Sequence, residues 1–231
     1  MELAKMIVEV IASVSVIVAS GAAIYGINAW RREFKGKRDI ELAEEVLALF
    51  YEARDAIKSI RSPLGFQGEG STRKPQEGET PEQKAARDSV YVVFERYEKR
   101  QEPFNKLRSK RYQFMVRFGY ESIKPFDDIE QIVREIFGAA RRLAHLYVKN
   151  MAASTAVKEN QHSQQVEKHE TIFWDTFGED DPINPRLDQV ISDIERICRP
   201  IIMEQKGIVP FFRRLWSKRP ENKKSSAEGA H

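Results

Sequence analysis

At 231 residues, the chain has room for one domain and an anchor, or for two small domains. Its 38 Lys and Arg residues barely outnumber its 35 Asp and Glu residues. This near-balance argues against a dedicated nucleic-acid-binding protein, which usually has a clear basic excess. The single cysteine, Cys198, excludes an intramolecular disulfide bond.

Residues 1–30 form an apolar segment that we interpret as a transmembrane anchor. No charged residue lies between Val10 and Ile27, and Trp30 stands where an interfacial aromatic residue is expected. At ~1.5 Å per residue, such a helix is long enough to cross a hydrocarbon core of ~30 Å. A cleaved signal peptide is the alternative, because small residues follow one another at 19–22. The apolar stretch is longer than a usual signal peptide requires, which favours the anchor.

A basic cluster after the apolar segment predicts the orientation of the anchor. One Lys precedes the segment, whereas five basic residues follow it, namely Arg31, Arg32, Lys35, Lys37 and Arg38. By the positive-inside rule, the short N-terminus lies outside and the rest of the chain is cytoplasmic, at the cell (inner) membrane. Trp30, Arg31 and Arg32 are predicted to lie at the membrane interface and to meet anionic lipid headgroups.

Small residues recur about every four positions along the anchor. This spacing lets two helices approach closely in a membrane, so we expect the anchor to associate with itself or with another helix. The alternative is that small residues are simply common in transmembrane helices. The residues of this face are Ser15, Ala19, Ala22, Ala23 and Gly26.

Residues 31–206 are predicted to form an all-α, antiparallel bundle of about four long helices on the cytoplasmic side. No segment outside the anchor has the alternation typical of a strand. Apolar residues at near-heptad spacing predict the first helix over residues 31–62, typical of a coiled coil or a core-facing helix. Only Gly36 separates this helix from the anchor, so the two are expected to be nearly continuous.

The second helix is predicted to begin at Thr80, where Pro81 suits the first helical position and Gln83 completes a capping box. Pro103 should kink or split this helix, because it lacks an amide hydrogen. Gly119 is its predicted end.

The third helix is predicted to open at Pro125 and to continue through the polar residues 158–170. The fourth begins at Asn184, and its length is limited by Pro200 and Gly207. An acidic turn over residues 178–182 connects the two.

A Gly-rich loop spans residues 63–80 between the first and second helices. A connection of this length is either functional or disordered. Its glycine spacing is similar to that of a phosphate-binding P-loop, but Ser71 stands where the lysine belongs and no strand precedes it. A flexible loop is therefore favoured over a nucleotide site, and weak anion binding by the backbone amides together with Arg73 and Lys74 is the functional alternative. The candidate residues of this loop are Gly65, Gly68, Gly70 and Arg73.

Other polar groups fall short of a catalytic or metal site. Glu159 and His162 have Glu-x-x-His spacing, but a di-iron bundle needs a second such pair. Arg141 and His145 lie one helical turn apart, and a half-buried histidine is favoured over a catalytic pair. The cluster at 179–181 lacks the spacing of an EF-hand and is interpreted as a helix cap. We therefore predict no catalytic residue, no cofactor and no metal ligand.

Residues 207–219 mix large aromatic and basic side chains, a composition that suits the headgroup region of an anionic leaflet. The alternative is a short helix that closes the base of the bundle. The residues predicted to contact the membrane here are Phe211, Phe212, Arg213, Arg214 and Trp216. Residues 220–231 are predicted to be a disordered tail.

The leading interpretation is a non-enzymatic, membrane-tethered helical module that binds an unknown protein partner or forms a homo-oligomer. No nucleic-acid partner is expected. One alternative is a membrane-anchored effector enzyme or ligand sensor that uses the Gly-rich loop or the histidine-bearing helix. Another is a module that senses anionic lipids through residues 207–219.

Overall fold

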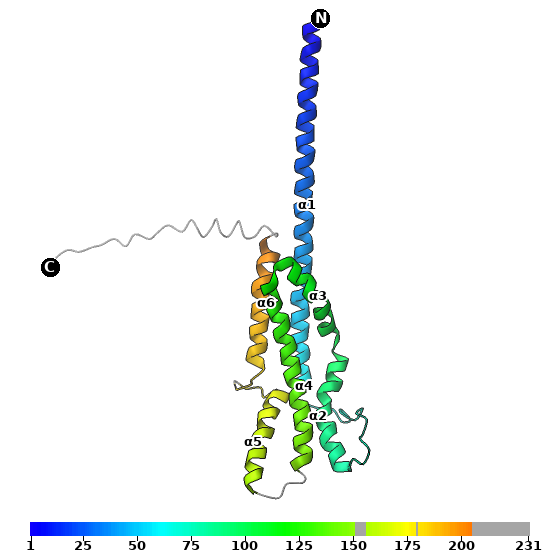
Figure 1. The fold of residues 1–231 in the computed structure, drawn as a ribbon, viewed down its shortest axis with the longest axis vertical. Coiled ribbons are helices and arrows are strands. Elements are labelled where there is room, and N and C mark those ends of the chain that lie inside the picture. Colours follow the sequence, from blue (N-terminus) through cyan, green and yellow to red (C-terminus); the bar gives the residue numbers. More distant parts are fainter. Residues whose placement is uncertain (151–155, 179, 205–231) are drawn as a thin grey trace, which may run out of the picture. The chain divides into compact units, whose positions relative to one another are not determined.

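The computed structural model describes residues 1–150, 156–178 and 180–204, without the side chains of 3–14, 17, 29, 32, 150, 156–159 and 204. This part of the chain is entirely helical outside its loops (Figure 1), which confirms the predicted all-α class. It holds more helices than the predicted four. They are α1 (Glu2–Arg61), α2 (Pro81–Lys99), α3 (Glu102–Phe118), the 3-10 helix η1 (Tyr120–Ile123), α4 (Lys124–Asn150), α5 (Ala156–Phe173) and α6 (Asn184–Glu204).

The chain divides into two compact units. Unit 1 comprises Met1–Leu42 and Pro200–His231, and unit 2 comprises Ala43–Arg199. In unit 1, every described side chain from Ser15 to Arg31 is exposed. Among the described residues, which leave out the side chains of 3–14, no helix has a stretch long and apolar enough to span a membrane. The predicted transmembrane anchor therefore stays a prediction.

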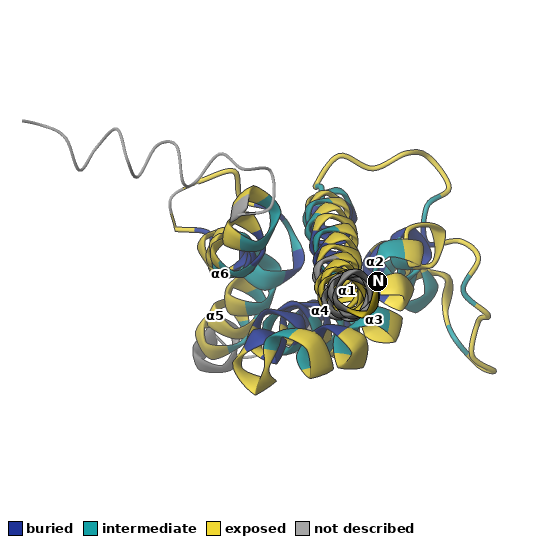
Figure 2. Cartoon of the chain, turned by 90° about the horizontal axis from the view of Figure 1, so that it is seen from above, coloured by how far each residue is buried: buried dark blue, intermediate teal, exposed yellow. Residues whose placement is uncertain are grey.

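Within unit 2, α1 contributes a strongly apolar face to the core. Buried residues recur at three- and four-residue intervals, as the sequence pattern predicts. The buried residues of the unit gather on the inward faces of its helices (Figure 2). Helix α1 also passes Gly36 without a break, which confirms the predicted continuity. Its fully buried side chains include Val46, Phe50, Ala53 and Ile57.

Helices α2 and α3 begin and end where the sequence predicts. The Thr80 hydroxyl accepts a hydrogen bond from the Gln83 amide at 3.3 Å, and the Gln83 side chain accepts one from the Thr80 amide at 3.3 Å. The helix is interrupted between Lys99 and Glu102, just before Pro103. This proline therefore splits the predicted second helix into α2 and α3. Gly119, with φ of 94°, ends α3.

Helices α4 and α5 are separate, so the prediction of one continuous third helix is wrong. The Tyr147 hydroxyl donates a hydrogen bond to the Glu170 carboxylate at 2.6 Å. In one continuous helix these residues would lie about 35 Å apart along the axis, at ~1.5 Å per residue. The chain must therefore reverse between them, and α5 packs beside α4 (Figure 1).

Helix α6 begins at Asn184, as predicted, but it does not end at Pro200. Pro200 lies inside the helix, which runs to Glu204. A proline removes one backbone hydrogen bond, and here the turns on both sides of it remain helical. Gly207, the other predicted limit, lies outside the described residues. The buried face of α6 includes Leu187, Ile194 and Cys198.

A buried ion pair joins the end of α1 to the connection between α5 and α6. The guanidinium of Arg61 donates to the carboxylate of Asp181, with both side chains fully buried. It also donates to the backbone carbonyls of Thr171, Ile172 and Trp174 at the end of α5. Asp181 in turn accepts from the backbone amides of Ile183 and Asn184 at the start of α6. The predicted capping role of the acidic turn is therefore confirmed for Asp181.

Candidate functional site

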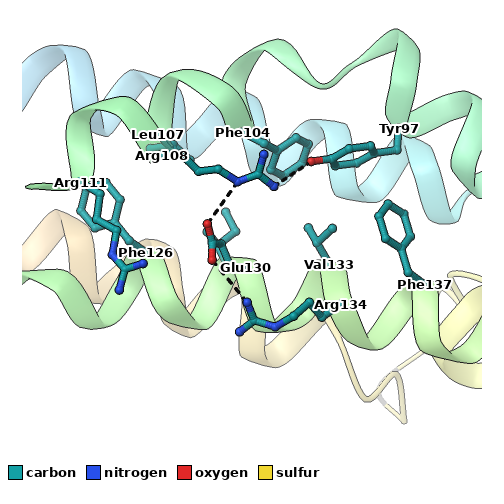
Figure 3. A pocket seen from close by; sticks show the side chains of 11 residues that line it. Tyr97, Phe104, Leu107, Arg108, Arg111, Phe126, Glu130, Val133, Arg134 and Phe137 are labelled. Atoms are coloured by element: carbon teal, nitrogen blue, oxygen red, sulfur yellow. Dashed lines mark hydrogen bonds and ion pairs between the residues drawn. The ribbon is translucent and has the colours of Figure 1, made fainter.

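A groove with a volume of about 250 Å³ opens between α2, α3 and α4 in unit 2. We call it the α3–α4 groove. Figure 3 shows Arg108 and Glu130 facing each other across the middle of the groove, with Tyr97 and Phe137 at one end and Arg111 and Phe126 at the other. It is lined by Tyr97, Phe104, Leu107, Arg108, Arg111, Phe126, Ile129, Glu130, Val133, Arg134 and Phe137.

The groove begins where α2 stops packing on α4. The Phe137 ring of α4 contacts the rings of Phe94 and Tyr97 of α2, with centroids 4.9 and 5.0 Å apart. Beyond the break at residues 100–101, α3 packs less closely on α4 than α2 does. The interruption of the helix before Pro103 therefore creates the space that the groove occupies.

The floor of the groove belongs to the apolar core. Phe104, Leu107, Phe126 and Ile129 are all buried. The Phe126 ring is held edge-on against the ring of Phe50 in α1, with centroids 4.9 Å apart. Close-packed side chains of this kind keep one arrangement, so the floor is preformed.

The rim of the groove has more positive than negative charge. The two carboxylate oxygens of Glu130 accept hydrogen bonds from Arg108 at 3.2 Å and from Arg134 at 3.3 Å. A second Arg108 nitrogen donates to the Tyr97 hydroxyl at 3.1 Å. Two guanidinium groups thus share a single carboxylate, which leaves one positive charge without an acidic partner among these residues.

A third arginine, Arg111, lies at the opposite end of the groove from Tyr97 and Phe137 (Figure 3). Its terminal nitrogen pairs with Asp127, and its guanidinium lies over the Tyr112 ring. Its Nε is buried and has no hydrogen-bond partner. A buried donor without a partner is uncommon in folded proteins.

The Gly-rich loop has a definite conformation, because two consecutive buried residues of α2 bind its backbone. Arg96 donates to the carbonyls of Ser62 and Leu64, and its head group pairs with Glu69. Glu95 accepts from the amides of Gly70 and Thr72 at 2.9 and 3.0 Å. Nothing in this arrangement resembles a phosphate cradle, because these two amides already have a carboxylate partner.

Two candidate residues of this loop have structural roles. Gly70 has φ of +86°, and a Cβ there would lie 1.9 Å from the Asp88 backbone oxygen. Arg73 is held between the carboxylates of Glu79 and Asp88, each at 2.7 Å. Gly65 and Gly68 are exposed, and Gly68 also has a positive φ. The loop is therefore ordered by internal contacts that do not require a ligand.

The histidine-bearing helix α5 carries two partly buried imidazoles. Nε2 of His162 and Nδ1 of His169 are buried without hydrogen-bond partners. Burial and the charges of Arg142 and Lys168 lower the pKa of His169, which favours its neutral form. The side chain of Glu159 lies outside the described residues. Among the side chains that are described, no group of three His, Cys, Asp or Glu is placed to hold a metal ion.

The other chemical candidates are placed as follows. Arg141 and His145 are both exposed, so the expectation of a half-buried His145 is wrong. Cys198 is buried in the core, and burial raises the pKa of its thiol to about 12. A thiol with so high a pKa is a poor nucleophile at neutral pH.

The predicted membrane and association residues are only partly described. Trp30 and Arg31 are exposed, whereas the side chain of Arg32 lies outside the described residues. The predicted membrane contacts at 207–219 and the predicted tail at 220–231 also lie outside the described residues. The small residues Ser15, Ala19, Ala22, Ala23 and Gly26 are all exposed on α1.

The sequence pattern did not predict the α3–α4 groove. Its apolar residues were expected to lie on the core-facing sides of helices, and the structure places them there. Its charged residues Arg108, Arg111, Glu130 and Arg134 look like ordinary solvent-facing positions in the sequence. The only available indication was that Arg108 and Arg111 are spaced by one helical turn beside the apolar Leu107.

Comparisons with known proteins give no family assignment: no protein-family model, no curated protein and no solved structure matches this chain. Any function must therefore be argued from its own residues.

Proposed function

We propose that this chain is a membrane-tethered helical module without catalytic activity, whose bundle binds a protein partner on the cytoplasmic side. The observation that supports the tether is the exposure of large apolar side chains along α1 in unit 1. Val16, Val18, Ile24, Ile27 and Trp30 are each more than half exposed. A helix with apolar side chains around its circumference needs an apolar environment, and a bilayer provides one.

The proposed orientation rests on the five basic residues that follow the apolar segment, compared with one before it. They would remain in the cytoplasm, next to the anionic headgroups of the inner leaflet. Trp30, at the boundary, is suited to the interface because its ring is apolar and its N–H can meet water. The chain would then place its N-terminus outside and unit 2 inside.

The orientation can be tested by labelling single cysteines with a membrane-impermeant maleimide. The natural Cys198 is buried, so the unmodified chain gives a low background. In intact spheroplasts, Glu2→Cys should react, whereas Gln164→Cys on α5 should react only after lysis. Labelling of Gln164→Cys in intact spheroplasts would contradict the proposed orientation.

Membrane insertion itself can be tested by alkaline extraction of Val18→Arg. An arginine near the centre of a transmembrane helix costs about 2.5–3.5 kcal/mol of insertion free energy. This variant should therefore be extracted more readily than the natural chain. Val116→Arg, at an exposed position of α3, is the matched control and should stay with the membrane. Full extraction of the natural chain would refute the anchor.

We further propose that the small-residue face of α1 packs against a second helix in the membrane. Ala19, Ala22, Ala23 and Gly26 are exposed and carry little bulk, so a neighbouring backbone can approach them closely. Gly26→Leu should reduce association of the anchor in a membrane two-hybrid assay, whereas Ile27→Leu should not. Equal association of the two variants would argue against this face.

The partner can be sought by purifying the tagged full-length chain in mild detergent from its host. A stoichiometric co-purifying protein, together with a matching complex mass, would support the interaction module. A chain that purifies alone as a monomer would count against it.

A further inference from the structure

We propose that the α3–α4 groove binds a small carboxylic acid that carries one aromatic ring. The carboxylate would be held by Arg108 and Arg134, and the ring would rest on the apolar floor. This inference goes beyond the proposed function and does not depend on the membrane anchor, because all the residues involved belong to unit 2.

The size of the groove sets the size of the ligand. An apolar cavity of about 150 Å³ is large enough to hold benzene. The α3–α4 groove has about 250 Å³, which leaves space for one ring and a short side chain. Pockets for larger, drug-sized molecules are about 300–1,000 Å³, so a multi-ring ligand would not fit.

The charges at the rim select an anion. Arg108 and Arg134 share the single carboxylate of Glu130, and both of its hydrogen bonds are long, at 3.2 and 3.3 Å. Each guanidinium has five N–H donors, so both retain donors for a second carboxylate. A bound monoanion would give each guanidinium a carboxylate partner. Guanidinium–carboxylate hydrogen bonds are charge-assisted and stronger than neutral ones.

The aromatic residues at the other end of the groove favour a ring over an aliphatic chain. Tyr97 contacts both Phe104 and Phe137, with ring centroids 5.1 and 5.0 Å apart. Figure 3 shows the rings of Tyr97 and Phe104 next to the guanidinium of Arg108, with Phe137 at the end of the groove. A ligand ring here would meet ring edges and faces at the spacing that aromatic pairs prefer, about 4.5–7 Å.

The unpartnered Nε of Arg111 adds an independent indication of a ligand at this site. It is a buried donor among the lining residues, and it has no acceptor in the part of the chain that the structure describes. Because a buried donor is costly to leave unpaired, an acceptor that enters the groove would gain from meeting it. A hydrogen-bond acceptor on the chain that carries the carboxylate, on the side away from the ring, would suit this end.

The test uses the full-length chain in lipid nanodiscs and a fluorinated probe, 3-(4-fluorophenyl)propanoate, followed by fluorine NMR relaxation. Its primary amide, which has the same ring and no charge, is the control ligand. Empty nanodiscs correct for partition into lipid. We expect saturable binding of the acid, with the amide at least about tenfold weaker, because a hydrogen bond to a charged group is lost. No saturable binding, or equal binding of acid and amide, would overturn the proposal.

Two variants with opposite expected effects locate the binding at this groove. Arg108→Gln should weaken acid binding about tenfold, because it removes a charge-assisted donor. Glu130→Gln should strengthen it, because Arg108 and Arg134 then lose their competing carboxylate. Both side chains reach solvent, so neither change should unfold the bundle, which circular dichroism will verify. Arg196→Gln, on the exposed surface of α6, is the matched control and should leave binding unchanged. Effects of the same sign in the first two variants would overturn the proposal.

Discussion

The guanidinium of Arg61 and the carboxylate of Asp181 lie 2.8 Å apart, and neither side chain reaches solvent. Between them they connect the last turn of α1, the last turn of α5 and the first turn of α6. Burial alone raises the pKa of Asp181, but hydrogen bonds from Arg61 and from the Asn184, Thr176 and Ile183 amides hold it well below its usual range. Three helix ends are therefore fixed by one charged pair.

Removing one member of this pair should destabilise unit 2 strongly. Asp181→Asn leaves the guanidinium of Arg61 buried without a counter-charge, which typically costs about 3–5 kcal/mol of unfolding free energy. Asp55→Asn removes the partner of Arg54 in an exposed pair and should cost less than about 1 kcal/mol. Urea titration of the full-length chain, followed by circular dichroism, measures both. Similar losses for the two variants would contradict the structural role of the buried pair.

The same pair predicts how stability depends on pH. Since the pKa of Asp181 is lower in the folded chain than in the unfolded chain, its contribution is complete above the unfolded value of about 3.9. It is lost as the pH falls below that value toward the folded pKa. The difference in unfolding free energy between the natural chain and Asp181→Asn should therefore be constant from pH 7 to about pH 5 and shrink in stronger acid. A difference that grows in acid would show that another group dominates.

The position of Gly70 predicts a substitution that the Gly-rich loop cannot accommodate. Gly70→Ala combines a positive φ with a Cβ only 1.9 Å from the Asp88 carbonyl oxygen, so the loop must move. At Gly78, φ is also positive, but no atom lies near the Cβ position. Gly78→Ala should therefore cost only the backbone strain, about 1–2 kcal/mol, and Gly70→Ala clearly more. Equal stability of the two variants would mean that the loop is not packed against α2 at Gly70.

Glu95 should protect the amides of Gly70 and Thr72 from hydrogen exchange. Glu95→Gln replaces one accepting oxygen by a donating amide, so one of these N–H groups must lose its partner. Exchange at Gly70 and Thr72, followed by mass spectrometry, should accelerate by roughly tenfold, as expected for the loss of a hydrogen bond to a charged group. Glu98→Gln, on the exposed side of the same helix, should leave the exchange unchanged. Unchanged exchange in Glu95→Gln would mean that the loop is held by other contacts.

Local chemistry made several helix ends predictable. Thr80 and Gln83 satisfy each other's backbone amides within one turn, and Pro103 suits the first turn of a helix, where an amide hydrogen has no partner within the helix. Gly119 ends α3 because its positive φ is easy only for glycine. Each of these effects depends on residues close together in the sequence, so a single sequence contains the necessary information.

Contacts between distant residues could not be predicted in the same way. Glu95 and Arg96 occupy ordinary positions in the alternation of polar and apolar residues along α2. Nothing in that pattern indicates that they bind the backbone of the Gly-rich loop, which begins more than thirty residues earlier in the sequence. The separation of α4 from α5 also involves contacts between residues far apart in the sequence, such as Tyr147 and Glu170. The α3–α4 groove likewise depends on how three helices pack together. From the sequence alone, charged residues such as Arg108 and Glu130 are predicted to face the solvent.

The binding of the Gly-rich loop by Glu95 and Arg96 changes its behaviour as a polymer. When a flexible connection joins two helices, the conformational entropy lost on closing the loop rises only slowly with its length. Here the chain is held at Leu64, Gly70 and Thr72, so it consists of short closed segments in series. A residue inserted between the exposed Lys74 and Pro75 would lengthen a segment between held points at little cost. A residue inserted at Ser71 would prevent the amides of Gly70 and Thr72 from reaching the Glu95 carboxylate together. The loop should therefore tolerate an insertion at one of these positions and not at the other, although they are only a few residues apart.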